Sequence, residues 1–346
     1  MWRDGALSDV LRRAWPVLSL AVALVIIAAL ASLGPATLQR TVTEAFIRLV
    51  IVIGIYVFIG NSGVLSFGHV SFMAIGAYGS ALLTIAPATK KIMLKLPPAM
   101  AALLLPVVPA GIIAALVASL FAFLIGLPLM RLSGISASMG TFAALAIVFV
   151  VISNWKSVTG GQSALIGVPV YTNVWIALIY ALLALVLAYV YQQSRFGVRL
   201  RASREDEVAA YAAGVNVRRE RMVGFVFSAF IVAFGGVLHA HFLGVLSSGS
   251  FYLDITFITL AMLVIGGINS LAGAVVGTVV VSTIGELLRL IESGFQVGGV
   301  HIGAPPGLKE VGLSLLMLLI LIFRPQGITG GHEVPWPVRR RASAGG

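Results

Sequence analysis

Residues 194–221 read SRFGVRLRASREDEVAAYAAGVNVRRER. They form the one long polar interruption in a chain that is otherwise almost continuously apolar. These 28 residues hold seven of the 23 Lys and Arg residues and four of the 12 Asp and Glu residues. The whole chain is 59% hydrophobic and 10% charged, whereas soluble globular proteins have about 25% charged residues. The contrast predicts an integral membrane protein whose main solvated segment is this stretch.

Within the stretch, residues 203–214 are predicted to form a short helix. Ser203 followed by Asp206 indicates a capping box, and Gly214 suits the position just after a helix end. A helix this short is marginal alone in water, so we expect it to dock on lipid headgroups or in a protein groove. Its mixed charge favours the protein groove. The apolar residues at helical spacing are Val208, Tyr211, Ala212 and Val215.

Outward from this stretch, the chain divides into about ten apolar segments. Most are close to 20 residues long and continuous, which predicts membrane-spanning helices rather than the alternating ten-residue strands of a membrane barrel. The predicted fold is therefore an all-α polytopic bundle in a single domain, residues 1–346. The segments are 15–33, 41–59, 70–85, 100–127, 135–152, 174–191, 222–242, 255–265, 274–291 and 311–323.

The basic residues predict the orientation of the chain. Ten crossings place both termini on one side, together with residues 194–221, and 15 of the 23 Lys and Arg residues then share that side. An excess of Lys and Arg marks the cytoplasmic side, although three lysines in residues 90–95 fall on the other. We therefore expect segment 1–14, loop 194–221 and tail 324–346 to be cytoplasmic. We prefer an uncleaved first span to a signal peptide, because no Ala-x-Ala cleavage site is evident.

Two runs of small and polar residues, 60–68 and 266–273, interrupt apolar segments. Free backbone groups at membrane depth are tolerated where they line a cavity or pack against protein. Such breaks often mark transport pathways, but small residues also permit ordinary close packing of helices. Both interpretations remain open from the sequence.

Several kinds of chemistry are excluded or disfavoured. The chain has no Cys, which excludes disulfides, thiolate metal sites and iron–sulfur clusters. None of its five lysines follows a glycine, as a Walker A loop requires, so this chain is not a P-loop ATPase. No catalytic set stands out, and we expect no metal or cofactor bound by this chain. The excess of Lys and Arg does not indicate nucleic-acid binding, because most of these residues lie in short loops and tails. Pairing of Glu44 with Arg48, and of Glu286 with Arg289, is expected near helix ends and disfavours an ion pump.

Four blocks resemble a known family, the permease subunits of bacterial ABC importers of the branched-chain amino acid type. Leu65, Ser66 and Gly68 favour the LivM-like subunit over the LivH type. The blocks are GVLSFGHVSFMAIGAY (63–78), TGG (159–161) with GVP (167–169), SRFG (194–197) with REDE (204–207), and GG (266–267) with SLAG (270–273); FRPQG (323–327) resembles the family's end.

The resemblance implies an importer permease in the bacterial inner membrane. It also implies a LivH-type permease partner, two cytoplasmic ATPase subunits that bind ATP and Mg, and an extracytoplasmic solute-binding protein. The solute would be a branched-chain amino acid or a related small polar solute such as urea, an amide or an aromatic acid. Asn61 and residues 162–165 depart from the family pattern, which leaves the solute open. The alternatives are a secondary transporter that needs no ATPase, and a membrane scaffold or receptor subunit.

The resemblance also assigns roles to two sets of residues. One would form the coupling helix that contacts the ATPase, and the other borders the two breaks and is a candidate for the pathway or gate. The coupling set is Ser203, Arg204, Glu205, Asp206, Glu207, Ala209, Ala210 and Gly214. The pathway set is Asn61, Ser62, Leu65, Ser66, Gly68, His69, Gly266, Gly267, Asn269 and Ser270.

Overall fold

The structure is a computed structural model that describes residues 3–297, 300–302, 305 and 307–334. It is 78% helical, and the strands among these residues form two short antiparallel ribbons. The ribbons pair β1 (Leu165–Ile166) with β2 (Val245–Leu246), and β3 (Phe295–Val297) with β4 (Val300–Ile302). The prediction of an all-α polytopic membrane protein is confirmed.

Eight helices in the described part of the chain are long and apolar enough to cross a membrane. Each is near or above the roughly 20 residues that hydrocarbon thickness requires. They are α1 (Arg3–Ser32), α2 (Ala36–Ser62), α6 (Val107–Leu129), α7 (Gly134–Asn154), α9 (Val174–Gln193), α12 (Val217–Leu243), α13 (Leu253–Gly266) together with the short η1 (Ser248–Phe251), and α14 (Leu271–Ser293).

Two further predicted segments form shorter helices. Helix α3 (His69–Thr84) has 16 residues and reaches spanning length only together with α4 (Pro87–Met93), from which a bend of 116° separates it. Helix α15 (Leu308–Phe323) also has 16 residues, and its apolar part, Glu310–Phe323, is shorter still. All ten predicted segments therefore lie on helices. By length and composition, eight or nine of the described helices qualify as spans, so ten crossings are not confirmed.

The predicted segment 100–127 is not one helix. Its start forms α5 (Pro98–Ala102), and α6 begins only at Val107, directly after Pro106. A proline lacks the amide hydrogen that an interior helical position needs and disfavours helix in the residue before it. The Leu105 amide instead donates to the Leu83 carbonyl at 2.9 Å, which ties the connection to the end of α3.

Helix α2 is the centre of the bundle. It packs against α12, α9 and α14, and its residues from Leu49 to Ile59 are all buried. A helix that is apolar all round has no face for solvent and belongs in a core. The sequence of α2, with its run of Val, Ile and Phe, thus explains its position.

Helices α3 and α12 cross closely because glycines remove side chains at their contact. A Cβ atom added to Gly76 would collide with the Ala233 carbonyl, and one added to Gly236 with the Met73 carbonyl. Small residues permit this approach between membrane helices, where dispersion contacts replace the hydrophobic effect as the driving force. The crossing fixes α3 deep in the bundle.

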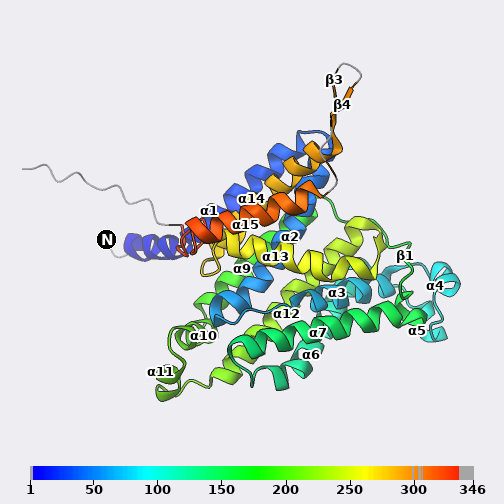
Figure 1. Cartoon of the computed structure of the whole chain (residues 1–346). Coiled ribbons are helices and arrows are strands. Elements are labelled where there is room, and N and C mark those ends of the chain that lie inside the picture. The colour runs from blue at the N-terminus through cyan, green and yellow to red at the C-terminus, as the bar shows by residue number, and fades with distance from the viewer. Residues whose placement is uncertain (1–2, 298–299, 303–304, 306, 335–346) are drawn as a thin grey trace, which may run out of the picture.

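The polar connections gather at the ends of the bundle. Figure 1 places α10 (Arg195–Glu205) and α11 (Glu207–Ala212) at one end, and α4 with the β3–β4 hairpin at the other. The Gly-rich loop, residues 155–173, connects α7 to α9 and contains α8 (Lys156–Thr159). Within it, Leu165 pairs with Leu246. The α10–α11 end holds the most polar stretch of the sequence, so the candidate site is built there.

Candidate functional site

The predicted helix 203–214 is two helices that meet at Asp206. The Asp206 carboxylate accepts hydrogen bonds from the amides of Val208 and Ala209 at 2.9 and 3.0 Å and so caps α11. The Ser203 hydroxyl instead donates to the Leu200 carbonyl at 2.7 Å, inside α10. The prediction that Ser203 opens the helix is therefore wrong. Both residue types bond to nearby backbone, and here the extended backbone of Asp206 provides the cap.

Gly214 ends α11 as predicted. Its φ of 81° is left-handed, the Gly214 amide donates to the Tyr211 carbonyl at 2.9 Å, and the Val215 amide donates to the Ala210 carbonyl at 3.0 Å. This pair of bonds is a Schellman motif, which satisfies carbonyls that the last helical turn leaves free. The turn then leads directly into α12.

Helix α11 turns an apolar side toward solvent. Val208 is 78% exposed and Tyr211 is 54% exposed, whereas Ala210 is buried. The Glu207 carboxylate accepts from Arg221 of α12 at 2.9 Å, which fixes the helix to the bundle. Beside it lies an open groove lined by Tyr211, Gly214, Val215, Asn216 and Arg218. The apolar face predicted for this helix is thus left uncovered by its own chain.

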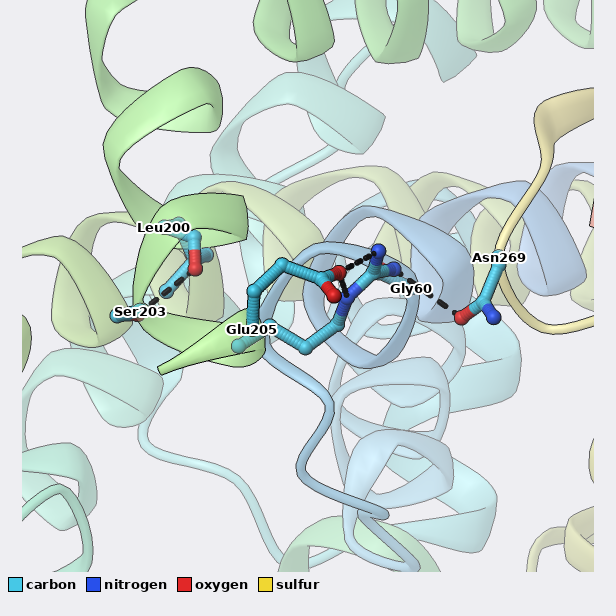
Figure 2. A network of polar contacts seen from close by, with 6 residues as sticks. Gly60, Leu200, Ser203, Glu205 and Asn269 are labelled. Carbon is cyan, nitrogen blue, oxygen red and sulfur yellow. Dashed lines mark hydrogen bonds and ion pairs between the residues drawn. The ribbon is translucent and has the colours of Figure 1, made fainter. Parts of the chain in front are cut away.

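Arg204 joins the polar stretch to both glycine-rich breaks. Its Nη1 atom donates to the Gly60 carbonyl at 2.7 Å and to the Asn269 Oδ1 atom at 3.1 Å. Its Nε and Nη2 atoms bind the Glu205 carboxylate at 3.0 and 2.5 Å. Figure 2 shows the network that links Glu205 of α10 with Gly60 at the end of α2 and Asn269 in the α13–α14 connection. Three segments far apart in the sequence therefore meet at one side chain.

Gly63 makes room for Arg204. It ends α2 with a left-handed φ of 71°, and a Cβ atom placed there would lie 2.6 Å from the Arg204 Cγ atom. Glycine adopts this conformation without steric cost. The sequence break at residues 60–68 thus supplies both a helix end and a surface on which the arginine stem rests.

The predicted pathway residues of the first break are mostly packed inside protein. Asn61, Ser66 and His69 are all at most 1% exposed. The His69 ring lies among Phe58, Phe72 and Phe225 at centroid distances of 5.6, 5.8 and 5.5 Å. In this conformation, the close-packing interpretation describes these residues. The other predicted residues of this break also contact neighbouring protein groups. Ser62 accepts from the Val64 amide, the Leu65 carbonyl accepts from Ser138, and Gly68 packs on Thr141.

The second break is closed by the C-terminal segment 327–334. The Ile328 amide donates to the Ile265 carbonyl at 2.9 Å, and the Thr329 amide and hydroxyl donate to the Gly266 carbonyl at 3.1 and 2.9 Å. Gly267, with a φ of 122°, lies against the same segment. Ser270 caps α14 by accepting from the Gly273 amide at 2.9 Å, and its hydroxyl lies 3.0 Å from that of Thr329.

Glu333 binds the start of α14, a role that the sequence did not predict. Its carboxylate accepts from the amides of Leu271 and Ala272 at 2.8 and 3.1 Å, where the positive end of the α14 dipole favours an anion. Gln192 donates to the same carboxylate at 3.4 Å, and Arg201 donates to the Gln192 carbonyl at 2.7 Å. No local pattern could have indicated the contact, because 62 residues separate Glu333 from Leu271.

The predicted ion pairs are present. Glu44 pairs with Arg48 in α2, and Glu286 pairs with Arg289 in α14 at 2.5 Å. Within the described ranges, no three His, Asp or Glu side chains come together in a way that could hold a metal ion. At the α10–α11 end, the Arg204 guanidinium joins helix ends through a backbone carbonyl and the Asn269 side chain.

Comparison with known proteins agrees with this architecture. Residues 37–322 match the family described as "Branched-chain amino acid transport system / permease component". The chain belongs to this family. The match covers α2 through nearly all of α15 and therefore includes both breaks and the α10–α11 stretch.

Individual permeases resemble the chain over different extents. The permease protein LivM of Escherichia coli is 26% identical over 331 residues, which cover 83% of this chain and 68% of LivM. The permease protein LivH of Escherichia coli is 33% identical over 162 residues, 46% of this chain and 47% of LivH. A nucleoside ABC transporter permease, NupC of Lactococcus lactis, is 32% identical over 43% of this chain and 42% of its own length.

The longer match with LivM confirms the resemblance found in the sequence. The family relatives are transporter permease components rather than enzymes, and a chain with these apolar helices is a multi-pass inner-membrane protein. The chain is accordingly a permease of the branched-chain amino acid ABC transporter type.

Proposed function

We propose that the chain is the LivM-type half of an ATP-driven importer. It would pair with a LivH-type permease, two cytoplasmic ATPase subunits that bind ATP and Mg, and an extracytoplasmic solute-binding protein. The proposal treats the whole chain as one permease domain with cytoplasmic termini. The observation that carries it is the position of Arg204, which bonds the α10–α11 stretch to the Gly60 carbonyl and to Asn269.

The contacts suggest a route for force. An ATPase groove would receive α11 by its exposed face around Val208 and Tyr211, with the Glu207–Arg221 pair and the Gly214 turn holding the helix to α12. A push on α11 passes into α10, because only Asp206 separates the two helices. Arg204 then moves the end of α2 and the start of α14 together. The two breaks thus act as the gate, although their side chains are packed in this conformation.

The solute we propose is a branched-chain amino acid. LivM and LivH carry that substrate in their names, and the family description does so as well. NupC, a relative over less than half of the chain, is named for nucleosides. Uptake of leucine but not of a nucleoside by the reconstituted transporter would support this solute, and the reverse would contradict it.

Replacement of Arg204 by Gln tests the coupling role. The complete transporter is reconstituted in liposomes, and leucine uptake and ATP hydrolysis are measured with the binding protein present. We expect Arg204→Gln to lower uptake at least tenfold, because a neutral amide cannot bond both breaks and Glu205, and charged hydrogen bonds are the stronger kind. ATP hydrolysis should continue but lose its dependence on the binding protein.

Arg195→Gln is the matched control. Arg195 is exposed on the same helix, and its guanidinium lies 4.9 Å from the centroid of the neighbouring Phe196 ring. This variant should transport normally. Normal uptake by an assembled Arg204→Gln transporter would show that force does not pass through this contact. Uptake by this chain alone, insensitive to vanadate, would instead support a secondary transporter.

A further inference from the structure

Segment 327–334 covers the second break and is bonded to both sides of it. Near the start of the segment, two of its amides donate to the carbonyls of Ile265 and Gly266 in the last turn of α13. Near its end, the Glu333 carboxylate accepts from two amides in the first turn of α14. The segment therefore spans the connection between these two helices.

The segment also packs directly on the backbone of the break. A Cβ atom added to Gly267 would lie 2.7 Å from the Thr329 hydroxyl oxygen, and one added to Gly327 would lie 2.6 Å from the Gly267 Cα atom. Small residues allow two backbones to approach this closely. A gate formed by the second break therefore cannot widen at this point while the segment is docked.

Hydrogen bonds, rather than apolar contacts, hold the segment in place. Of its eight residues, all within the described part of the chain, only Gly327 is buried. Ile328 is 40% exposed, and Val334 packs on the core from a partly buried position. Water replaces such hydrogen bonds on release, so their net contribution is modest. Few buried apolar contacts are typical of segments that open locally.

The backbone of the segment also makes docking costly. Gly327, Gly330 and Gly331 have left-handed φ values of 76°, 60° and 75°. Glycine adopts these angles without steric cost, but it loses more conformational freedom on ordering than any other residue. Three glycines in eight residues thus favour the released state and reduce the net stability of the docked one.

We propose that segment 327–334 leaves the second break when the transporter opens and returns when it closes. The inference rests on the proposed function, in which the two breaks act as the gate, and it adds a releasable cover to one of them. Arg204 bonds Asn269 inside the covered connection. A push that arrives through Arg204 therefore acts on the residues that the segment holds.

The competing interpretation is that the segment joins α13 to α14 permanently. These helices already contact each other closely without it. A Cβ atom added to Gly266 would collide with the Gly273 carbonyl, and one added to Gly277 with the Met262 carbonyl. Because the helix pair does not need the segment to stay together, the contacts favour a removable cover.

A reversible disulfide tests whether the segment must be released. The hydroxyl oxygens of Ser270 and Thr329 lie 3.0 Å apart, so sulfur atoms at these positions could bond after a small side-chain rotation. The chain has no Cys, and a disulfide within the double variant Ser270→Cys/Thr329→Cys is therefore unambiguous. In liposomes that contain the complete transporter, we expect the oxidised variant to take up leucine at least tenfold more slowly than the same preparation after reduction.

A second disulfide controls for oxidation itself. Ile166 and Val245 are exposed neighbours across the β1–β2 pair. Strand β2 precedes α13, whereas the second break follows it, so this pair lies away from the gate. Oxidised Ile166→Cys/Val245→Cys should transport as its reduced form does. If free-thiol titration confirms the Ser270–Thr329 disulfide and uptake is equal before and after reduction, the segment does not leave the break.

Hydrogen exchange measures release without cysteines and decides the question if the reduced variant is inactive. In the unaltered transporter, the amides of Ile328 and Thr329 should exchange at least tenfold faster during turnover with ATP, binding protein and leucine than without ATP. The buried amide of Val52 in α2 is the reference and should not change. Unchanged exchange at Ile328 and Thr329 would overturn the inference.

The outcomes also separate this inference from the proposed function. Normal uptake by the locked transporter means that the cover is wrong and the function stands. If the unaltered transporter takes up no leucine with ATP and the binding protein, the proposed function fails. Release is then measured on this chain alone in lipid nanodiscs, where the disulfide should slow exchange at Ile328 and Thr329 at least tenfold. Equal exchange in the oxidised and reduced forms would overturn release as well.

Discussion

At the scale of single residues, two glycines with similar backbone angles should respond differently to alanine. Gly63 and Gly214 have φ values of 71° and 81°, and alanine in this region costs about 1–2 kcal/mol. A Cβ atom at Gly214 meets nothing within 4 Å, whereas at Gly63 it would press on Arg204. Gly63→Ala should therefore destabilise the protein more than Gly214→Ala does. Thermal unfolding of both purified variants in detergent measures the difference, and equal destabilisation would contradict the contact with Arg204.

For single residues, the sequence indicated helix ends better than it indicated contacts. Gly214 was predicted from its position after a short helix, and the Schellman bonds agree. Ser203 was misassigned because serine and aspartate cap helices by the same chemistry, and only the fold decides which of them has an extended backbone. Arg204 was selected through a family resemblance. Its bonds to Gly60 and Asn269 could not be derived, since they span 144 and 65 residues.

At the scale of elements, apolar segments located the helices but not their interruptions. The Pro106 break inside the segment 100–127 could be recognised in retrospect from the residue type, because proline disfavours helix in the residue before it. The docking of segment 327–334 on the second break could not, because its hydrogen bonds to Ile265 and Gly266 depend on chain folding alone. Long-range backbone pairing leaves no periodic pattern in the sequence.

Glu333 should stabilise the start of α14. Glu333→Ala removes a carboxylate that binds two amides, and such a loss at a helix N-terminus costs about 1–2 kcal/mol. We expect hydrogen exchange at the amides of Leu271 and Ala272 to accelerate about tenfold. Glu310→Ala, in the first turn of α15, is the matched control and should leave those amides unchanged. Unaltered exchange in Glu333→Ala would mean that Ser270 alone caps the helix.

At the scale of the whole molecule, composition determined the class of protein, but helix length left the number of crossings open. The contacts of α15 bear on that number. Just before α15, the Gly307 amide donates at 2.8 Å to Glu292 at the end of α14. Just after α15, the amides of Ile328 and Thr329 donate to carbonyls at the end of α13, close to the start of α14. Helix α15 therefore runs back along α14 (Figure 1). We keep ten crossings, with cytoplasmic termini, as a prediction.

The absence of cysteine from the sequence makes this topology directly testable. Single cysteines at Ala213, in the α10–α11 stretch, and at Gln162, in the Gly-rich loop, occupy exposed positions. In intact cells, an impermeant thiol reagent should label Gln162→Cys and not Ala213→Cys. In inside-out vesicles the pattern should reverse. Labelling of both from the same side would contradict the predicted orientation and the proposal that α11 binds an ATPase.

The Glu333 carboxylate that caps α14 can bind only late in the synthesis of the chain. Translation at about 5–20 residues per second places Glu333 roughly 3–12 seconds behind Leu271, which it binds across 62 residues. During that interval the ribosome has yet to complete the segment that closes the second break. A chain that stops short of residue 327 would hold most of its helices but would leave the carbonyls of Ile265 and Gly266 without the amides that bind them.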